Sequence, residues 1–284
     1  MQPLANVTPL KPAMRTGAIE VKNVGQVFRT SSQEVVALEN VSLEVKPGRF
    51  VVLVGPSGCG KSTLLMMMAG LLQQTSGTIT INGAPIPQPD PDRVGVVFQE
   101  ASLFPWLTAE ENVEFPLALR GVAKSERRAK AEAMLKLVGL DGFGKRHPHE
   151  LSGGMKQRVS IARGLVQDPP VLLMDEPFAA LDEQTRLLLG DKVLKIQEEL
   201  KQTTLLITHN ITEAVQLSDR VIIMTFRPGK VKRIVDIRLP RPRTDDIISS
   251  EAFGRHVAEI WNDLREEASR GMAESEDGAR RGRH

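Results

Sequence analysis

Hydrophobic positions along this chain fall into short runs that are separated by polar turns. In residues 18–24 and 41–47 apolar and polar residues alternate, a pattern typical of strands buried on one face. The continuous apolar run at 49–55 is typical of a strand buried on both faces. By the same patterns, further strands are expected at 77–83, 93–98, 171–176, 203–209 and 220–226. Strands that alternate with helices predict a doubly wound α/β fold.

Helical periodicity occupies much of the chain between these runs. We expect helices at 62–72, 109–119, 126–138 and 155–165. Thr108 and Glu111 make a capping box at the start of the second helix. Ser125 is expected to cap the third helix, and Gly139 to end it. Residues of about 100–158 are therefore expected to form a helical insert.

The C-terminal third predicts further capped elements. Asp182 is expected to cap one helix, and Asn210 with Glu213 to begin the next. A turn and a strand are expected at 227–239, and an amphipathic helix at 245–268. The polar composition of the last residues predicts a disordered tail. We divide the chain into a flexible N-terminal arm, a main domain that carries the insert, and a C-terminal helix with that tail, at residues 1–17, 18–244 and 245–284.

Composition narrows the function classes. The chain has 284 residues, of which 41% are hydrophobic, enough for a large core. Its 37 basic and 35 acidic residues leave a formal charge of +2, so nucleic-acid binding is not expected. A single cysteine excludes an internal disulfide. The apolar run at 64–72 is shorter than the roughly 20 residues that a spanning helix needs, and residues 1–17 lack the apolar core of a secretory signal.

Four of the apolar runs end at a residue that could bind a ligand or take part in a reaction. These residues are Gly55, Gln99, Asp175 and His209. Ligands of doubly wound sheets bind beyond the carboxyl ends of the strands. The four strand ends therefore predict one site.

A glycine-rich loop follows the first of these strands. The residues "GPSGCGKST" fit the pattern G-x-x-x-x-G-K-[ST] between a strand and a helix. Glycines allow the backbone N–H groups to surround a phosphate, Lys61 adds a cation, and Ser62 offers a hydroxyl to Mg²⁺. ATP is therefore expected to bind Gly55, Pro56, Ser57, Gly58, Cys59, Gly60, Lys61, Ser62 and Thr63.

Cys59 lies inside this loop. The helix terminus is expected to lower the pKa of its thiol, and bound nucleotide to shield it from alkylation. The alternative is that Cys59 is a small filler with no role in binding.

Carboxylates at the end of the 171–176 strand are suited to metal binding and to base catalysis. Successive strand residues face opposite sides, so we assign Asp175 to Mg²⁺ and Glu176 to an attacking water as general base. Gln99 can reach the metal or the water, and His209 can bind the terminal phosphate and orient the water. Both residues could instead be simple caps at strand ends.

Two further candidates have competing interpretations. Phe28 can stack on the base of the nucleotide, or it can be a buried residue of a small sheet. His147 and His149 have a spacing that suggests a metal site, but no third ligand follows nearby, so surface histidines are favoured.

A second helix start is also suited to a phosphate. Ser152, Gly153 and Gly154 precede the helical pattern at 155–165 and offer a hydroxyl and free N–H groups. If both loops held the same ATP within one chain, the insert would have to fold over the first loop. A symmetric dimer, in which each chain closes the site of the other, is the simpler arrangement.

These motifs together resemble those of the ATP-binding cassette (ABC) ATPases. The stretches "GPSGCGKST", "FQE", "LSGGMKQR", "VLLMDEP", "AALD" and "ITHN" occur in the family's order over roughly 18–240. The resemblance implies a P-loop NTPase (RecA-like) core with a small antiparallel β subdomain and the inserted helical subdomain. It also implies a homodimer with two ATP molecules between the chains, in which Asp182 senses the partner.

Finer stretches are similar to the ATPases of nitrate, sulfonate and taurine importers. There the segment after Gln99 docks on two membrane permease subunits, so Phe104, Pro105, Trp106 and Leu107 are expected to form the docking patch. Trp106 could instead pack inside the insert. The resemblance implies an ATPase at the cytoplasmic face of the membrane that serves a substrate-binding protein indirectly. The alternatives are a soluble ABC ATPase with a non-membrane partner and an ATP-binding regulator without turnover.

Overall fold

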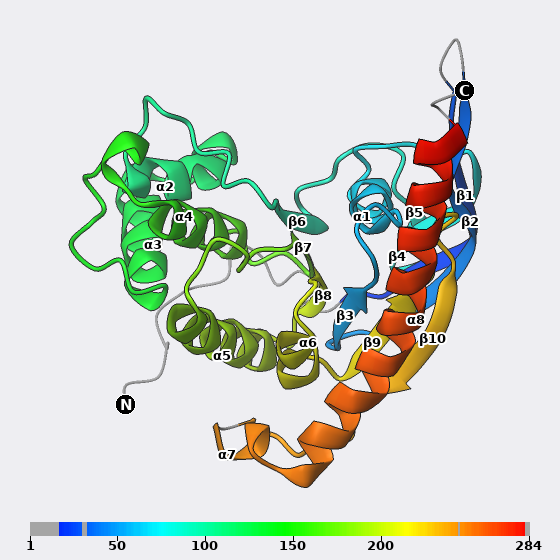
Figure 1. Cartoon of the computed structure of the whole chain (residues 1–284). Coiled ribbons are helices and arrows are strands. Elements are labelled where there is room, and N and C mark those ends of the chain that lie inside the picture. Colours follow the sequence, from blue (N-terminus) through cyan, green and yellow to red (C-terminus); the bar gives the residue numbers. More distant parts are fainter. Residues whose placement is uncertain (1–16, 30–32, 244, 282–284) are drawn as a thin grey trace.

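The computed structural model describes residues 17–29, 33–243 and 245–281, drawn as ribbons in Figure 1. Most of the expected N-terminal arm, residues 1–16, lies outside this range. Gly17 is buried, and its N–H donates to the Thr203 hydroxyl at 3.3 Å. The chain therefore joins the fold at the last residue of the predicted arm.

A mixed sheet of six strands forms the centre, in the order β10-β9-β3-β8-β7-β6. Its strands are β3 (Phe50–Val54), β6 (Val94–Val97), β7 (Val171–Asp175), β8 (Thr203–Ile207), β9 (Arg220–Met224) and β10 (Val231–Asp236). Only β10 runs antiparallel to its neighbour. Every residue of β3, β7 and β8 is buried, which explains the apolar runs at 50–54, 171–174 and 205–207.

A smaller antiparallel sheet lies beside the central one, in the order β2-β1-β4-β5. Its strands are β1 (Ile19–Arg29), β2 (Glu34–Val45), β4 (Ser76–Ile81) and β5 (Ala84–Pro85). We expected the second strand to begin at residue 41, but it begins at Glu34. Val35 and Val36 are exposed there, so the segment lacks the alternation that identifies a half-buried strand.

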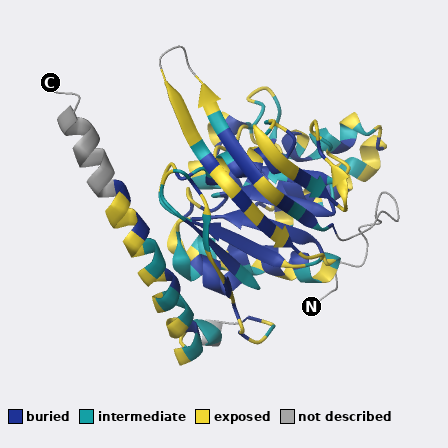
Figure 2. Cartoon of the chain, turned by 90° about the vertical axis from the view of Figure 1, so that its right-hand side faces the viewer, coloured by how far each residue is buried: buried dark blue, intermediate teal, exposed yellow. Residues whose placement is uncertain are grey.

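Helices and the small sheet cover the two faces of the central sheet. Val51 and Leu53 of β3 pack into one core with α1 (Lys61–Met68) and the small sheet. Phe50, Val52 and Val54 face a second core, which includes residues of every other long helix. The sheet therefore separates two hydrophobic cores, and the buried strand positions are visible in Figure 2.

The expected helical insert lies between β6 and β7. Its helices are α2 (Ala109–Leu119), α3 (Lys124–Leu137), the 3₁₀ turn η1 (Pro148–Glu150) and α4 (Gly153–Leu165). The capping box of Thr108 and Glu111 is present. The prediction for Ser125 was wrong, because α3 begins at Lys124 after Ala123 and Ser125 lies inside its first turn.

The last helices pack against the second core and the edge of the central sheet. They are α5 (Glu183–Leu200), α6 (Ile211–Leu217), α7 (Asp245–Ile248) and α8 (Glu251–Arg281). Figure 1 shows α8 running along β9 and β10. The helix continues to Arg281, through most of the stretch expected to be a disordered tail, because Ala, Glu, Met and Arg favour helix there. None of the helices that the structure describes is long and apolar enough to cross a membrane.

Candidate nucleotide site

The glycine-rich loop connects the carboxyl end of β3 to the start of α1. Gly58 and Gly60 have φ values of +74° and +100°, a region that favours glycine. A Cβ on Gly60 would lie 2.6 Å from Leu38 Cδ2, and one on Gly58 would lie 2.8 Å from Arg227 Nη2. A side chain would be strained at both positions because of φ, and at Gly60 it would also clash with Leu38.

Lys61 is held against this loop. Its Nζ donates to the carbonyl oxygens of Gly55 and Pro56, at 2.9 Å each, and the residue is buried. A buried ammonium needs such partners, because desolvation of an unpaired charge is costly. The cation is therefore fixed in position at the loop, where a phosphate can take the place of the carbonyl acceptors.

The loop forms one wall of a pocket of about 650 Å³. It is lined by Phe28, Val35, Ala37, Ser57, Gly58, Gly60, Lys61, Ser62, Thr63, Gln99, Glu176, His209 and Arg227. Ten of these are residues that the sequence predicted for the site. The other predicted residues do not line the pocket: Gly55, Pro56, Cys59, Ser152, Gly153, Gly154, Asp175 and Asp182. Phe28 is 40% exposed, so the interpretation as a buried residue is wrong. Its ring, Val35 and Ala37 are the apolar part of the pocket lining.

Asp175, at the end of β7, is the candidate metal ligand. Burial raises the pKa of its carboxyl, the charge of Glu176 raises it further, and a hydrogen bond with Ser62 opposes the shift. Its Oδ1 is buried and has no hydrogen-bond partner among the described residues. An orphaned carboxylate oxygen beside a hydroxyl fits Mg²⁺, a hard cation that prefers oxygen ligands.

Glu176 lies at the centre of a polar cluster on the pocket wall. Its Oε2 is 3.1 Å from His209 Nδ1 and accepts from Gln99 Nε2 at 3.5 Å. The backbone of Glu176 has a φ of +45°, an uncommon value for a residue with a side chain. The strained backbone and the two partners place the carboxylate in the pocket, where it can accept a proton from water.

The second predicted phosphate-binding segment does not reach this pocket. Ser152 caps α4, and its Oγ accepts from the N–H of Met155 at 3.2 Å. A Cβ on Gly154 would lie 3.2 Å from Leu181, next to Asp182, the N-cap of α5. Figure 1 shows α4 on the other side of β6 and β7 from α1. Gly154 thus packs against the segment before α5, and none of Ser152, Gly153, Gly154 and Asp182 lines the pocket.

The predicted docking patch lies at the start of the insert. Trp106 is 70% exposed, so the interpretation that it packs inside the insert is wrong. The Phe104 ring lies 5.5 Å from the Trp106 ring and 4.6 Å from the Phe115 ring, measured between centroids. Arg163 of α4 donates to the carbonyl oxygens of the preceding loop, at 2.8 and 2.9 Å. An exposed tryptophan is thus supported by a fixed loop.

Two further expectations concern Cys59 and the pair His147 and His149. Cys59 is fully buried, and burial raises the pKa of its thiol, so the expected lowering by the helix terminus was wrong. Its side chain is a filler beneath the loop, and bound nucleotide is not needed to shield it. The rings of His147 and His149 stack at 5.7 Å. No group of three or more His, Cys, Asp or Glu within the described ranges has metal-binding geometry.

Arg227 lines the pocket but was not among the predicted site residues. It lies in the turn between β9 and β10, and its Nε donates to the Gly58 carbonyl at 2.8 Å. The only signal in the sequence was an arginine in a turn that follows a buried strand. Such turns are common, and nothing in the local sequence indicates that this one reaches the nucleotide loop.

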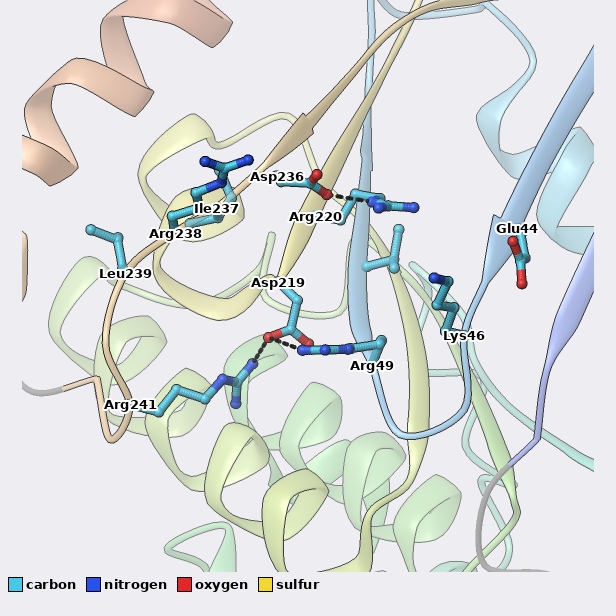
Figure 3. A pocket seen from close by; sticks show the side chains of 11 residues that line it. Glu44, Lys46, Arg49, Asp219, Arg220, Asp236, Ile237, Arg238, Leu239 and Arg241 are labelled. Carbon is cyan, nitrogen blue, oxygen red and sulfur yellow. Dashed lines mark hydrogen bonds and ion pairs between the residues drawn. The ribbon is translucent and has the colours of Figure 1, made fainter.

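A second pocket, of about 450 Å³, lies beside the amino ends of β3 and β9, whereas the first pocket lies beyond the carboxyl ends of the strands. Figure 3 shows Asp219 there between Arg49 and Arg241, at 3.6 and 2.8 Å. Arg220 pairs with Asp236 at 2.7 Å. Through Asp219, Arg241 of the segment after β10 is linked to Arg49 just before β3, and the Arg220–Asp236 pair joins β9 to β10. None of the predicted site residues lines this pocket.

Comparisons with known proteins agree with these observations. Residues 38–179 match the family model described as ABC transporter. The chain is 45% identical to the nitrate import ATP-binding protein NrtD of Synechocystis sp., over 87% of this chain and 95% of the relative. It is 44% identical to the aliphatic sulfonates import ATP-binding protein SsuB of Bacillus cereus, over 83% and 91%. A dimeric, post-hydrolysis structure of the cassette MJ0796, bound to ADP and phosphate, matches with a TM-score of 0.73 and 36% identity, over 78% of this chain and 100% of that one. The predicted P-loop NTPase fold is confirmed.

Proposed function

The chain belongs to the ABC transporter family of ATPases, and on that premise we propose that it is the ATP-hydrolysing subunit of an importer. Two copies hold two ATP molecules between them, and separate membrane subunits form the transport path. The importer relatives and the dimeric cassette structure support this proposal.

One observation in particular supports the proposed dimer. Lys61 lines the nucleotide pocket, whereas Ser152, Gly153 and Gly154, at the start of α4, do not. The start of α4 is suited to bind a phosphate, but it does not reach the ATP that its own chain would bind. In a two-fold dimer the surface of one copy covers the pocket of the other, so each ATP contacts both chains.

The pocket supports in-line hydrolysis of ATP. The phosphates bind the loop and Lys61, and the base stacks on Phe28. Ser62, Asp175 and Gln99 would hold Mg²⁺, which supplies positive charge beside the terminal phosphates when it is bound. Glu176 accepts a proton from the attacking water, and His209 fixes the Glu176 carboxylate and orients the water. Ser152 of the second copy donates to the terminal phosphate and so stabilises the charge of the transferred group.

Closure of the dimer is the step that performs mechanical work. ATP favours the closed state because its contacts with the second copy exist only there. Each insert moves with its α4, and Arg163 links that helix to the loop of Phe104 and Trp106. We place the permease subunits on this exposed patch, at the cytoplasmic face of the membrane. The cargo is a small anion such as nitrate, a sulfonate or taurine, delivered by a substrate-binding protein.

Phosphate release by the purified chain tests the enzymatic part of the proposal. We expect ATP-dependent release from the wild type and none from Lys61→Ala. Growth tests the transport part: cells that lack this chain should fail on nitrate, an alkanesulfonate or taurine as sole nitrogen or sulfur source. Restoration by the wild type but not by Lys61→Ala supports an importer. Hydrolysis without any growth or uptake defect would contradict it.

A further inference from the structure

The turn between β9 and β10 joins the nucleotide pocket to the C-terminal helix. On the pocket side, the Arg227 side chain lies on Gly58, with its Nε donating to the Gly58 carbonyl at 2.8 Å. The guanidinium approaches Gly58 so closely that a Cβ there would lie 2.8 Å from Nη2. An arginine of the β9–β10 turn therefore contacts the glycine-rich loop.

The small sheet fixes the far end of this turn. The N–H of Gly229 donates to the Ala37 carbonyl at 2.9 Å, and the N–H of Glu39 donates to the Gly229 carbonyl at 3.1 Å. Within the turn, the Thr225 hydroxyl donates to the Pro228 carbonyl at 3.0 Å. The turn is thus bonded to the wall of the pocket that carries Ala37.

The C-terminal helix α8 holds the near end of the turn. Glu267 accepts from the backbone N–H of Phe226 at 3.0 Å, and it is buried with 1% exposure. Lys232 lies 2.8 Å from the same carboxylate and compensates its charge. A Cβ on Gly271 would lie 2.8 Å from the Phe226 ring, so the ring packs directly on the helix backbone.

We propose that Arg227 is a second cation that binds the phosphates of ATP, and that Glu267 of α8 is the positioning residue that holds it there. The inference rests on the proposed nucleotide site and extends it. It gives the C-terminal helix a role in setting the affinity for nucleotide. Arg227 contacts the ligand, whereas Glu267 acts only through the backbone of Phe226.

The chemistry of the guanidinium favours phosphate over the base as its ligand. Arginine has five N–H donors, and the contact with Gly58 uses only one of them. The donors lie in a plane that matches two oxygens of a phosphate. Gly58 belongs to the loop that is expected to surround the phosphates, whereas Phe28 supplies a face for the base. Within the described pocket lining, Lys61 is the other residue with a permanent positive charge.

Nucleotide binding and steady-state hydrolysis by the full chain test this assignment. Arg227→Met should raise the Kd for Mg-ADP and the KM for ATP by about tenfold, the loss expected for one charged hydrogen bond. The kcat at saturating ATP should stay within about twofold, because the lost contact exists in both the ground state and the transition state. Arg227→Lys should give an intermediate Kd. The side chain is exposed, so these variants are expected to fold.

Variants of α8 test the positioning role. Glu267→Met should raise the KM for ATP, as Arg227→Met does. Glu267→Gln should leave it unchanged, because the amide oxygen still accepts from the N–H of Phe226. Glu266→Met is the matched control: Glu266 also pairs with Lys232 and Arg270 but has no bond to Phe226. In the Arg227→Met background, Glu267→Met should add no further increase in KM.

The outcomes separate this inference from the proposed function. An unchanged Kd in Arg227→Met, or equal losses in Arg227→Lys and Arg227→Met, would overturn the phosphate contact. A Glu267→Met effect that adds fully to that of Arg227→Met would overturn the positioning role. Nucleotide binding by the wild type, with Lys61→Ala as the control, tests the pocket itself. If the wild type binds no nucleotide, the proposed function fails as well.

Discussion

The carboxylate of Glu176 lies 3.1 Å from Nδ1 of His209, and the two residues follow neighbouring parallel strands, β7 and β8. The pairing of these strands brings their carboxyl ends to the same edge of the sheet. Residues that are 33 positions apart in sequence thereby become hydrogen-bond partners. The pair is the part of the pocket that we propose activates water.

His209→Ala should lower kcat by about 100-fold, because Glu176 loses the partner that fixes its carboxylate. The KM for ATP should change little, since Lys61 and the glycine-rich loop remain intact. Phosphate release at several ATP concentrations separates the two parameters. His147→Ala, a histidine of the insert outside the pocket, is the control. A raised KM with an unchanged kcat would instead give His209 a role in binding alone.

Trp106→Ala should leave both basal hydrolysis and folding stability nearly unchanged. The side chain is 70% exposed, and substitutions at exposed positions usually shift the free energy of unfolding by less than about 0.5 kcal/mol. Leu117→Ala, at a fully buried position of the neighbouring helix α2, should cost about 2–5 kcal/mol. Denaturant unfolding compares the two. A loss in Trp106→Ala as large as in Leu117→Ala would show that the tryptophan is a packing residue.

Glu213→Gln should change how stability depends on pH. Burial raises the pKa of the Glu213 carboxyl from 4.5 to about 7. A proton is therefore held more tightly in the folded state than in the unfolded state. Protonated Glu213 therefore contributes to the free energy of unfolding. This contribution is fully present below pH 4.5 and is lost as the pH rises to about 7. This shift in pKa corresponds to a change in the free energy of unfolding of on the order of 3 kcal/mol.

Thermal unfolding of the wild type and of Glu213→Gln between pH 4.5 and 8 measures this effect. The variant should gain stability relative to the wild type as the pH rises, and the difference should level off above pH 7. A difference that stays constant over this range would mean that Glu213 titrates at its ordinary pKa in the folded protein.

Features that depend on local sequence were predicted well. The apolar runs of β3, β7 and β8 identified buried strands, because strands that are covered on both faces consist mostly of apolar residues. The caps at Thr108 and Asp182 follow from side chains that bond the backbone three residues later.

Features that depend on distant parts of the chain were missed or mistaken. Arg227 and Gly58 are 169 positions apart, and only the path of the β9–β10 turn brings them together. The pKa of Cys59 depends on burial by other elements, which outweighs the helix terminus and nearby Lys61. The exposed first residues of β2 have no hydrophobic pattern, although they pair with β1 beside Phe28.

The proposed dimer depends on the open surface at the start of α4, and Gly153 provides a specific control for it. A Cβ at Gly153 would meet nothing within 4 Å, so Gly153→Glu should fold and bind ATP as a single chain. In a dimer the new carboxylate would face the phosphates held by the second copy. Like charges repel at close range, so this variant should not dimerise.

Light scattering on Glu176→Gln at saturating Mg-ATP tests most directly whether each ATP is held by two chains. Without the proposed general base, ATP should persist, so we expect a stable particle of twice the single-chain mass. Glu176→Gln combined with Gly153→Glu should remain at the single-chain mass while it still binds ATP. If Glu176→Gln binds one ATP per chain and remains a monomer, the shared nucleotide site is contradicted.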